Sequence, residues 1–214
     1  MRVRSWTLPL PLVALATVLF AVTPAQADII FSDFGPGYGF YTGAGWLISG
    51  VNSSWGLNTV AMDFTPGATY TLTQIDVAVG WDSGTNGITL SLNDSPYGVP
   101  GVALETWNLT GLPRDGVAID TVTPLTQINL VAGTQYWIVA AGLSDTMAGW
   151  SWNSIGETGN FALDMGSGWG AYPGQRQGAF DVQGSSSSST PEPATALFAA
   201  AGLGLLAVFR RKRR

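Results

Sequence analysis

Between residues 28 and 184, short apolar runs alternate with polar residues at every second position. In the run ITLSLN at residues 88–93, for example, each apolar side chain stands two residues from the next. Glycine, proline, asparagine or aspartate interrupts such runs roughly every eight to twelve residues, and no helical period is sustained. A period of two places alternate side chains on opposite faces of a β-strand, so the pattern predicts an all-β domain.

About eleven strands of this kind predict an antiparallel β-sandwich of jelly-roll type. The 157 residues of this segment (184 − 27) suit one domain with a sizeable core. The run at residues 136–143 is apolar at both parities, which indicates a central strand covered on both faces. The alternation changes phase near Thr73 and Gln74, so a β-bulge is expected there. The expected strands are residues 29–34, 45–50, 59–64, 70–81, 88–93, 102–109, 117–122, 128–131, 136–143, 149–153, 161–165 and 179–182.

The body of the chain is strongly acidic. Residues 28–184 contain two arginines, no lysine and thirteen Asp or Glu residues, a formal net charge of 2 − 13 = −11. Such a charge repels phosphate backbones, which argues against nucleic acid as a partner. The chain has no cysteine for disulfides and no histidine, the commonest general base and metal ligand. No motif predicts a cofactor or a metal site, because residues 82–87 fit a hairpin turn better than a calcium loop.

The first 27 residues have the organisation of a secretory signal peptide. Arg2 and Arg4 form a basic start, residues 8–22 are apolar, and Ala25 and Ala27 form a small-x-small cleavage site. Cleavage after Ala27 places the domain at residues 28–184, in an exported protein. Residues 185–190, five serines and a threonine, follow the domain as a flexible linker.

The last segment, residues 191–214, combines three elements. Pro191, Glu192 and Pro193 form a stiff, non-helical start, because each proline fixes its own φ and favours extended geometry in the residue before it. The apolar residues 194–209 predict a single hydrophobic helix of about 24 Å, short for a hydrocarbon core of about 30 Å. A basic end keeps this terminus in the cytoplasm by the positive-inside rule. Its residues are Arg210, Arg211, Lys212, Arg213 and Arg214.

This tail resembles the PEP-CTERM sorting signal of Gram-negative bacteria in its tripeptide, its apolar segment and its basic end, which follow a secretion signal in the same chain. The resemblance covers about 25 residues. It implies processing near Pro191–Pro193 by an exosortase, a membrane-embedded transpeptidase-like enzyme. The protein would then be exported to the envelope, surface or medium, with a transient membrane anchor in the C-terminal helix. The alternative is an ordinary C-terminal membrane anchor.

Two stretches of the body resemble the "choice-of-anchor" β-sandwich domains of bacterial surface proteins. They run from Ser91 through Gly98-Val99-Pro100-Gly101 to Trp107, and from Leu130 to Val139. The resemblance consists of strand and turn patterns, and it carries over no catalytic residue.

Four aromatic residues are candidates for carbohydrate binding. Trp150 and Trp152 share one strand face by the period of two, and Trp169 and Tyr172 lie among glycine and serine. A flat aromatic row can stack on sugar rings. The alternative is that these rings belong to the core.

A glycoside hydrolase would need two carboxylates about 5 to 10 Å apart, and Glu105 and Glu157 are the only glutamates of the body. The simpler interpretation is that most of the Asp and Glu side chains keep the surface of an exported protein hydrated. The sequence therefore favours a non-catalytic surface protein associated with extracellular polysaccharide or matrix. The alternatives are a purely structural coat protein and, third, a glycan-acting hydrolase.

Overall fold

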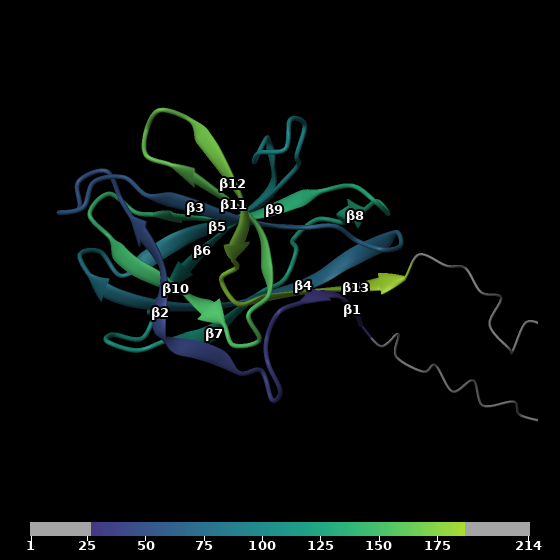
Figure 1. Cartoon of the computed structure of the whole chain (residues 1–214), viewed down its shortest axis with the longest axis horizontal. Helices are drawn as coiled ribbons and strands as arrows, with labels where there is room; N and C mark the ends of the chain where they lie inside the picture. The colour runs from purple at the N-terminus through teal and green to yellow at the C-terminus, as the bar shows by residue number, and fades with distance from the viewer. Residues whose placement is uncertain (1–26, 187–214) are drawn as a thin grey trace, which may run out of the picture. The chain divides into compact units, whose positions relative to one another are not determined.

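The computed structural model describes residues 27–186, which form thirteen β-strands in two antiparallel sheets (Figure 1). The expected all-β sandwich is confirmed. None of the described residues belongs to a helix long and apolar enough to cross a membrane. The predicted signal peptide up to residue 26, the linker beyond Ser186 and the whole predicted sorting segment lie outside the described residues.

The first sheet has seven strands in the order β1-β13-β4-β10-β2, and β7 and β8 also pair with the long strand β4. Its strands are β1 (Asp28–Ser32), β2 (Phe40–Ser49), β4 (Tyr70–Ser83), β7 (Ala118–Val122), β8 (Asn129–Leu130), β10 (Met147–Asn153) and β13 (Phe180–Ser186).

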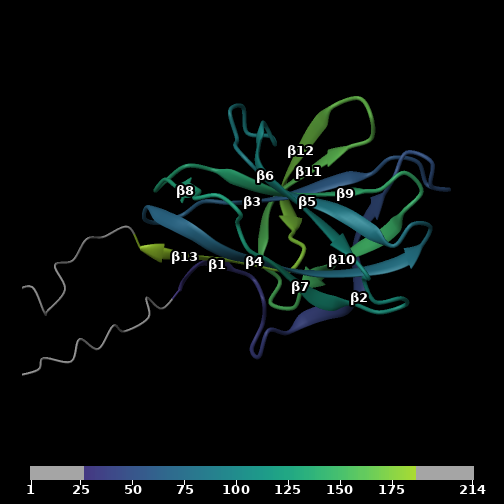
Figure 2. The same cartoon turned by 180° about the vertical axis from the view of Figure 1, so that it is seen from behind.

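The second sheet has six strands in the order β12-β11-β3-β9-β5-β6. Its strands are β3 (Thr59–Phe64), β5 (Gly87–Asn93), β6 (Ala103–Thr110), β9 (Tyr136–Gly142), β11 (Thr158–Asp164) and β12 (Trp169–Arg176). The two views in Figures 1 and 2 show β3, β5 and β9 of this sheet facing β4 and β10 of the first.

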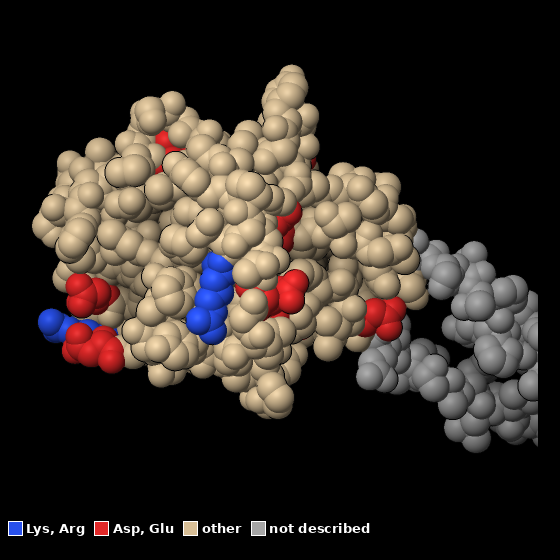
Figure 3. Space-filling model, viewed as in Figure 1, with Lys and Arg blue, Asp and Glu red and all other residues tan. Residues whose placement is uncertain are grey.

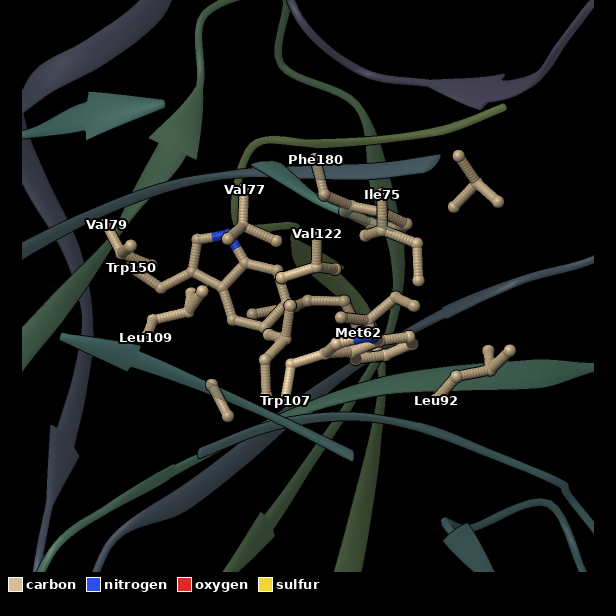
Figure 4. Packing of buried hydrophobic residues seen from close by; sticks show 14 of the residues in the cluster. Met62, Ile75, Val77, Val79, Leu92, Trp107, Leu109, Val122, Trp150 and Phe180 are labelled. Atoms are coloured by element: carbon tan, nitrogen blue, oxygen red, sulfur yellow. The ribbon is translucent and has the colours of Figure 1, made fainter. Parts of the chain in front are cut away.

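The core fills the space between the two sheets with the side chains that the period of two points inward. Figure 4 shows the indole of Trp150 beside Val77 and Val79 of the first sheet and Leu109 of the second. These residues are fully or almost fully buried. With no disulfide available, this burial of apolar surface is the main source of stability.

Strand β9 is the central strand that its apolar sequence predicted. Ile138 and Ala140 point into the core between the sheets, while Trp137 and Val139 lie on the outer face of the second sheet. There Trp137 is fully buried, and its Nε1 donates a hydrogen bond to Ser95 Oγ at 3.0 Å. The prediction of a strand covered on both faces is therefore confirmed.

The expected β-bulge in β4 is also confirmed. Leu72 pairs with Gly184 and Gln74 with Gln183, so Thr73 has no opposite residue in β13. One extra residue shifts the side-chain phase of a strand. This is why the inward positions change parity between the two halves of β4.

Several strand bounds differ from the expectations. Strand β2 begins at Phe40, five residues before the expected start at residue 45, and therefore includes Tyr41. Strand β12 was not among the expected strands. It is an edge strand, where its proline and glycines are tolerated. Strand β13 runs two residues past the predicted domain end, because Ser185 pairs with Thr71 and Ser186 with Tyr70.

The two ends of the domain lie side by side in the first sheet. Asp28, the first residue of β1, pairs with Gly184 near the end of β13. The chain therefore enters and leaves the sandwich at the same end of this sheet (Figure 2).

Candidate functional site

Trp150, the first of the predicted sugar-stacking residues, is a core residue. It pairs with Trp46 on one side and Val79 on the other, which directs its side chain between the sheets. Its exposed fraction is 0%, and its Nε1 donates a hydrogen bond to the carbonyl of Ala179 at 2.9 Å. The prediction that Trp150 stacks on sugar was therefore wrong, and the alternative of a core aromatic holds for this residue.

Trp169 and Tyr172 lie on opposite faces of β12. Trp169 pairs with Asp164 and packs on the outer face of the second sheet, against the small patch that includes Trp137. Tyr172 pairs with Phe161, whose side chain points to the inner face. The four predicted aromatics therefore do not form one flat row.

A different group of aromatic rings gathers where β2, an edge strand of the first sheet, meets β12, an edge strand of the second. Neighbouring rings follow one another across this edge of the sandwich with centroid distances of 3.9 to 6.4 Å. We call this group the aromatic edge. Its residues are Tyr41, Trp46, Trp152, Phe161, Tyr172 and the cation Arg176.

The ring geometry of the aromatic edge is close-packed. Trp46 stacks on Phe161 at 3.9 Å and meets Trp152 edge-on at 6.0 Å. Trp152 in turn lies almost parallel to Tyr41, at 6.4 Å with an interplanar angle of 15°. Stacked and edge-to-face pairs of this kind add about 0.5 to 1.5 kcal/mol each beyond area burial. The edge is therefore a preorganised surface.

Arg176 is held in place within the aromatic edge. Its Nε and Nη2 donate hydrogen bonds to the carbonyl of Asn153 at 3.1 and 2.6 Å. Its Cζ lies 5.2 Å from the ring centre of Tyr41 and 5.5 Å from that of Trp152, within the range of cation–π attraction. Within residues 27–186, no carboxylate forms an ion pair with Arg176. Its remaining N–H groups can donate to a ligand.

The aromatic edge is open to solvent at both ends. Tyr41 is 46% exposed and Tyr172 is 48% exposed, whereas Trp46 and Trp152 between them are half-buried. Figure 3 shows that charged side chains are sparse and scattered on the face that it draws. Half-exposed rings beside oriented N–H donors are a combination suited to the C–H faces and hydroxyl groups of sugars.

Of this group, the sequence predicted Trp152 and Tyr172 as site residues. It did not indicate Tyr41, Trp46, Phe161 and Arg176. The missing contacts depend on pairing between distant strands. Trp152 pairs with Tyr41 while Ser151 pairs with Gly45, so three residues of β2 bulge between them. Nothing in the local sequence signals this register shift.

A groove of about 380 Å³ crosses the outer face of the first sheet, which we call the glycine groove. Its floor follows the pairing of Leu47 on β2 with Gly149 on β10, and of Gly149 with Gly80 on β4. Two of these three positions have no side chain, so the floor beside the Leu47 side chain is backbone. The segment at residues 115–117 forms one wall, and the bulge at residues 42–44 forms another.

The two glutamates considered for hydrolysis lie far apart. Glu105 is on β6, and Glu157 directly precedes β11, with three strands between β6 and β11. At about 4.8 Å per strand this separation is roughly 19 Å, beyond the spacing of a hydrolytic pair. Glu105 also accepts hydrogen bonds from the backbone N–H groups of Leu125 and Thr126. It therefore caps a turn.

Asp33 is the carboxyl with the strongest perturbation. Burial raises the pKa of Asp33 to about 8, against the opposing effect of a hydrogen bond from the backbone N–H of Phe180. A raised pKa is typical of a general acid. However, Asp33 has an exposed fraction of 0%, so no substrate reaches it in this conformation.

The comparison with protein families concerns the tail beyond the described residues. A family model described as the PEP-CTERM protein-sorting motif matches residues 189–214. The match spans the predicted tripeptide Pro191–Pro193 and the basic end Arg210–Arg214. No curated protein matches the chain. The matched motif indicates a protein that is exported to the cell envelope or surface and processed by an exosortase-type enzyme.

Proposed function

We propose that this surface-sorted protein attaches to extracellular polysaccharide without cleaving it, through the aromatic edge. The observation that carries the proposal is Arg176, an arginine without a carboxylate partner among the described residues, which lies beside both the Tyr41 and the Trp152 ring. An arginine with a purely structural role at the surface commonly forms an ion pair with a carboxylate. Here the guanidinium is instead oriented by the two rings and by its hydrogen bonds to the carbonyl of Asn153, and its remaining N–H groups are left for a ligand.

The two half-exposed tyrosines define where a glycan chain would lie. Tyr41 and Tyr172 lie at the two ends of the aromatic edge, so a sugar can stack on either ring. The hydroxyls of a sugar on Tyr41 can accept hydrogen bonds from Arg176, which lies beside that ring. Because the rings are fixed by their mutual packing, little side-chain entropy is lost on binding. Such a surface supports attachment to a repeating polymer.

The chemistry of the acids supports a non-catalytic role. The glutamates do not lie together, and the carboxyl with the most raised pKa is buried. In this proposal the apolar segment at residues 194–209 anchors the chain in the membrane only until the exosortase-type enzyme acts. The processed domain then serves as an acidic, glycan-bound component of the envelope or matrix.

The test compares the variant carrying Tyr41→Ala and Tyr172→Ala with the variant Tyr97→Ala. Tyr97 is 90% exposed and lies outside the aromatic edge, in the segment between β5 and β6, so it controls for loss of a surface tyrosine. The measurement is binding of each exported protein to the polysaccharide of the source cells, with circular dichroism to confirm folding. We expect at least tenfold weaker binding for the double variant and unchanged binding for Tyr97→Ala.

Equal binding by all three proteins would contradict the role of the aromatic edge. No binding by the unsubstituted protein would instead favour a structural coat protein. Release of reducing sugar ends during the incubation would favour the hydrolase.

A further inference from the structure

We infer that the glycine groove is a second glycan-binding site, selective for amino sugars that carry a free, protonated amine. The inference rests on the proposed attachment to polysaccharide, and it adds the chemical class of that polysaccharide and a site distinct from the aromatic edge. It is carried by three properties of the groove: its floor, its walls and the sign of its charge.

The floor of the groove is open backbone at Gly149. A Cβ at Gly149 would have no heavy atom within 4 Å, so the space above it is empty. The carbonyl of Gly116 approaches Gly80 from the adjoining segment and closes the floor on that side. Glycine positions let a ligand approach the main chain closely. At about 380 Å³, the groove lies within the range of small-ligand sites.

The walls offer apolar contact on two sides. Leu47 from β2, Met147 from β10 and Val117 from the opposite wall line the groove and are half-buried. A pyranose presents C–H groups on its ring faces and polar groups around its rim. Apolar side walls over a backbone floor therefore match a sugar ring that lies flat in the groove.

The charge of the lining selects an amine. Asp82 and Asp115 line the groove and are exposed, and no Lys or Arg is among the lining residues. The nearest cation in sequence, Arg114, is placed over Trp81 with its Cζ 5.3 Å from the ring centre, and its Nε lies 3.7 Å from Asp115. Asp82 has no ion pair within the described residues. Its carboxylate can receive an ammonium group.

The charge of the whole body acts in the same direction. With a formal charge of −11 over residues 28–184, the surface attracts cationic polymers and repels uronate or phosphate polymers. Neutral sugars gain nothing from this field. A glycan with free amines is thus the class that both the groove and the body favour.

The experiment measures binding of glucosamine hexamer and of N-acetylglucosamine hexamer to the exported, processed protein at pH 6, where the amine is protonated. The variants are Asp82→Asn with Asp115→Asn, and separately Gly149→Phe, which fills the groove. The control is Glu157→Gln, which removes a negative charge outside the groove. We expect at least tenfold preference of the unsubstituted protein for the amine-bearing hexamer, lost in the first variant and kept in the control.

Gly149→Phe should weaken binding of the glucosamine hexamer at least fivefold, and the Asn variant decides the outcome if the Phe variant fails to fold. An equal loss in Glu157→Gln would indicate diffuse attraction to the acidic body and overturn the site. Equal binding of both hexamers would overturn the amine selectivity while leaving the proposed attachment intact. If neither hexamer binds but the source polysaccharide binds through Tyr41 and Tyr172, this inference fails and the proposed function stands.

Discussion

The buried carboxyl of Asp33 predicts an unusual dependence of stability on pH. Asp33 Oδ1 accepts a hydrogen bond from the backbone N–H of Phe180 at 2.7 Å, while Oδ2 is buried with no hydrogen-bond partner among the described residues. Desolvation therefore favours the neutral acid and raises its pKa from 3.8 to about 8. The folded protein thus holds a proton at neutral pH that the unfolded chain has released.

The sign of the pH dependence of stability follows from this difference in bound protons. Between about pH 4 and pH 8 the native state binds more protons than the unfolded state, so the free energy of unfolding falls as pH rises. A shift of about four pH units at 1.36 kcal/mol per unit sets an upper limit of roughly 6 kcal/mol. The stabilisation is fully present below pH 4 and is lost as pH rises through the folded pKa of about 8.

The assay is urea unfolding of the exported protein at pH 5.5, 7 and 8.5, followed by tryptophan fluorescence, with Asp33→Asn for comparison. The asparagine amide oxygen can still accept the hydrogen bond of Phe180 but carries no titrating group. We expect the free energy of unfolding of the unsubstituted protein to fall by about 3 kcal/mol across this range, because the slope of about 1.36 kcal/mol per pH unit flattens at the folded pKa of about 8. The variant should lose much less.

Burial also raises the pKa of Asp181 and of Asp120, and the pH dependence that these two carboxyls contribute has the same sign and is common to both proteins. The difference between the two proteins therefore isolates Asp33. A free energy of unfolding that stays level or rises from pH 5.5 to pH 8.5 in the unsubstituted protein would refute the reasoning, as would an equally steep fall in Asp33→Asn.

Two further predictions concern the core and the tail. Trp150→Ala should lower the free energy of unfolding by about 3 to 5 kcal/mol, because it leaves a cavity between the sheets. The control Trp55→Ala, at a side chain that is 68% exposed, should change it by less than about 1 kcal/mol. Equal urea midpoints for the two variants would show that Trp150 is not a core residue. Replacing Pro191, Glu192 and Pro193 by alanine should leave the basic end Arg210–Arg214 on the protein and alter its localisation, which mass spectrometry and cell fractionation can measure. An intact basic end on surface protein with the natural tripeptide would show that the tail is a simple anchor.

The sandwich was predictable because its strands are encoded locally. Strand β3, at Thr59–Phe64, was expected at the bounds it has, and the bulge at Thr73 was visible as a change of phase. Strand β12 escaped prediction because its glycines and proline break the alternation. It forms a hairpin with the preceding strand β11, in which Asp164 pairs with Trp169, so the glycine-rich residues 165–168 are the turn of that hairpin.

The candidate site was less predictable than the fold. The period of two placed Trp150 and Trp152 on one face, but the period alone does not say whether that face points to solvent or to the other sheet. That choice depends on which strands flank β10, namely β2 and β4. The glycine groove arises in the same way, because Gly80 and Gly149 are 69 positions apart in sequence (149 − 80) and meet only through strand pairing.

The position of β13 determines how the domain bears a mechanical load applied through its tail. This strand lies between β1 and β4, and its last residue, Ser186, is where the C-terminal segment leaves the domain. In antiparallel pairs the hydrogen bonds run perpendicular to the strands. A force along β13, with the opposite end of the sheet held fixed, therefore loads the hydrogen bonds to β1 and β4 in shear and all at once. A domain tethered by this strand resists extraction far better than one whose terminal strand lies at an edge and can be unzipped one bond at a time.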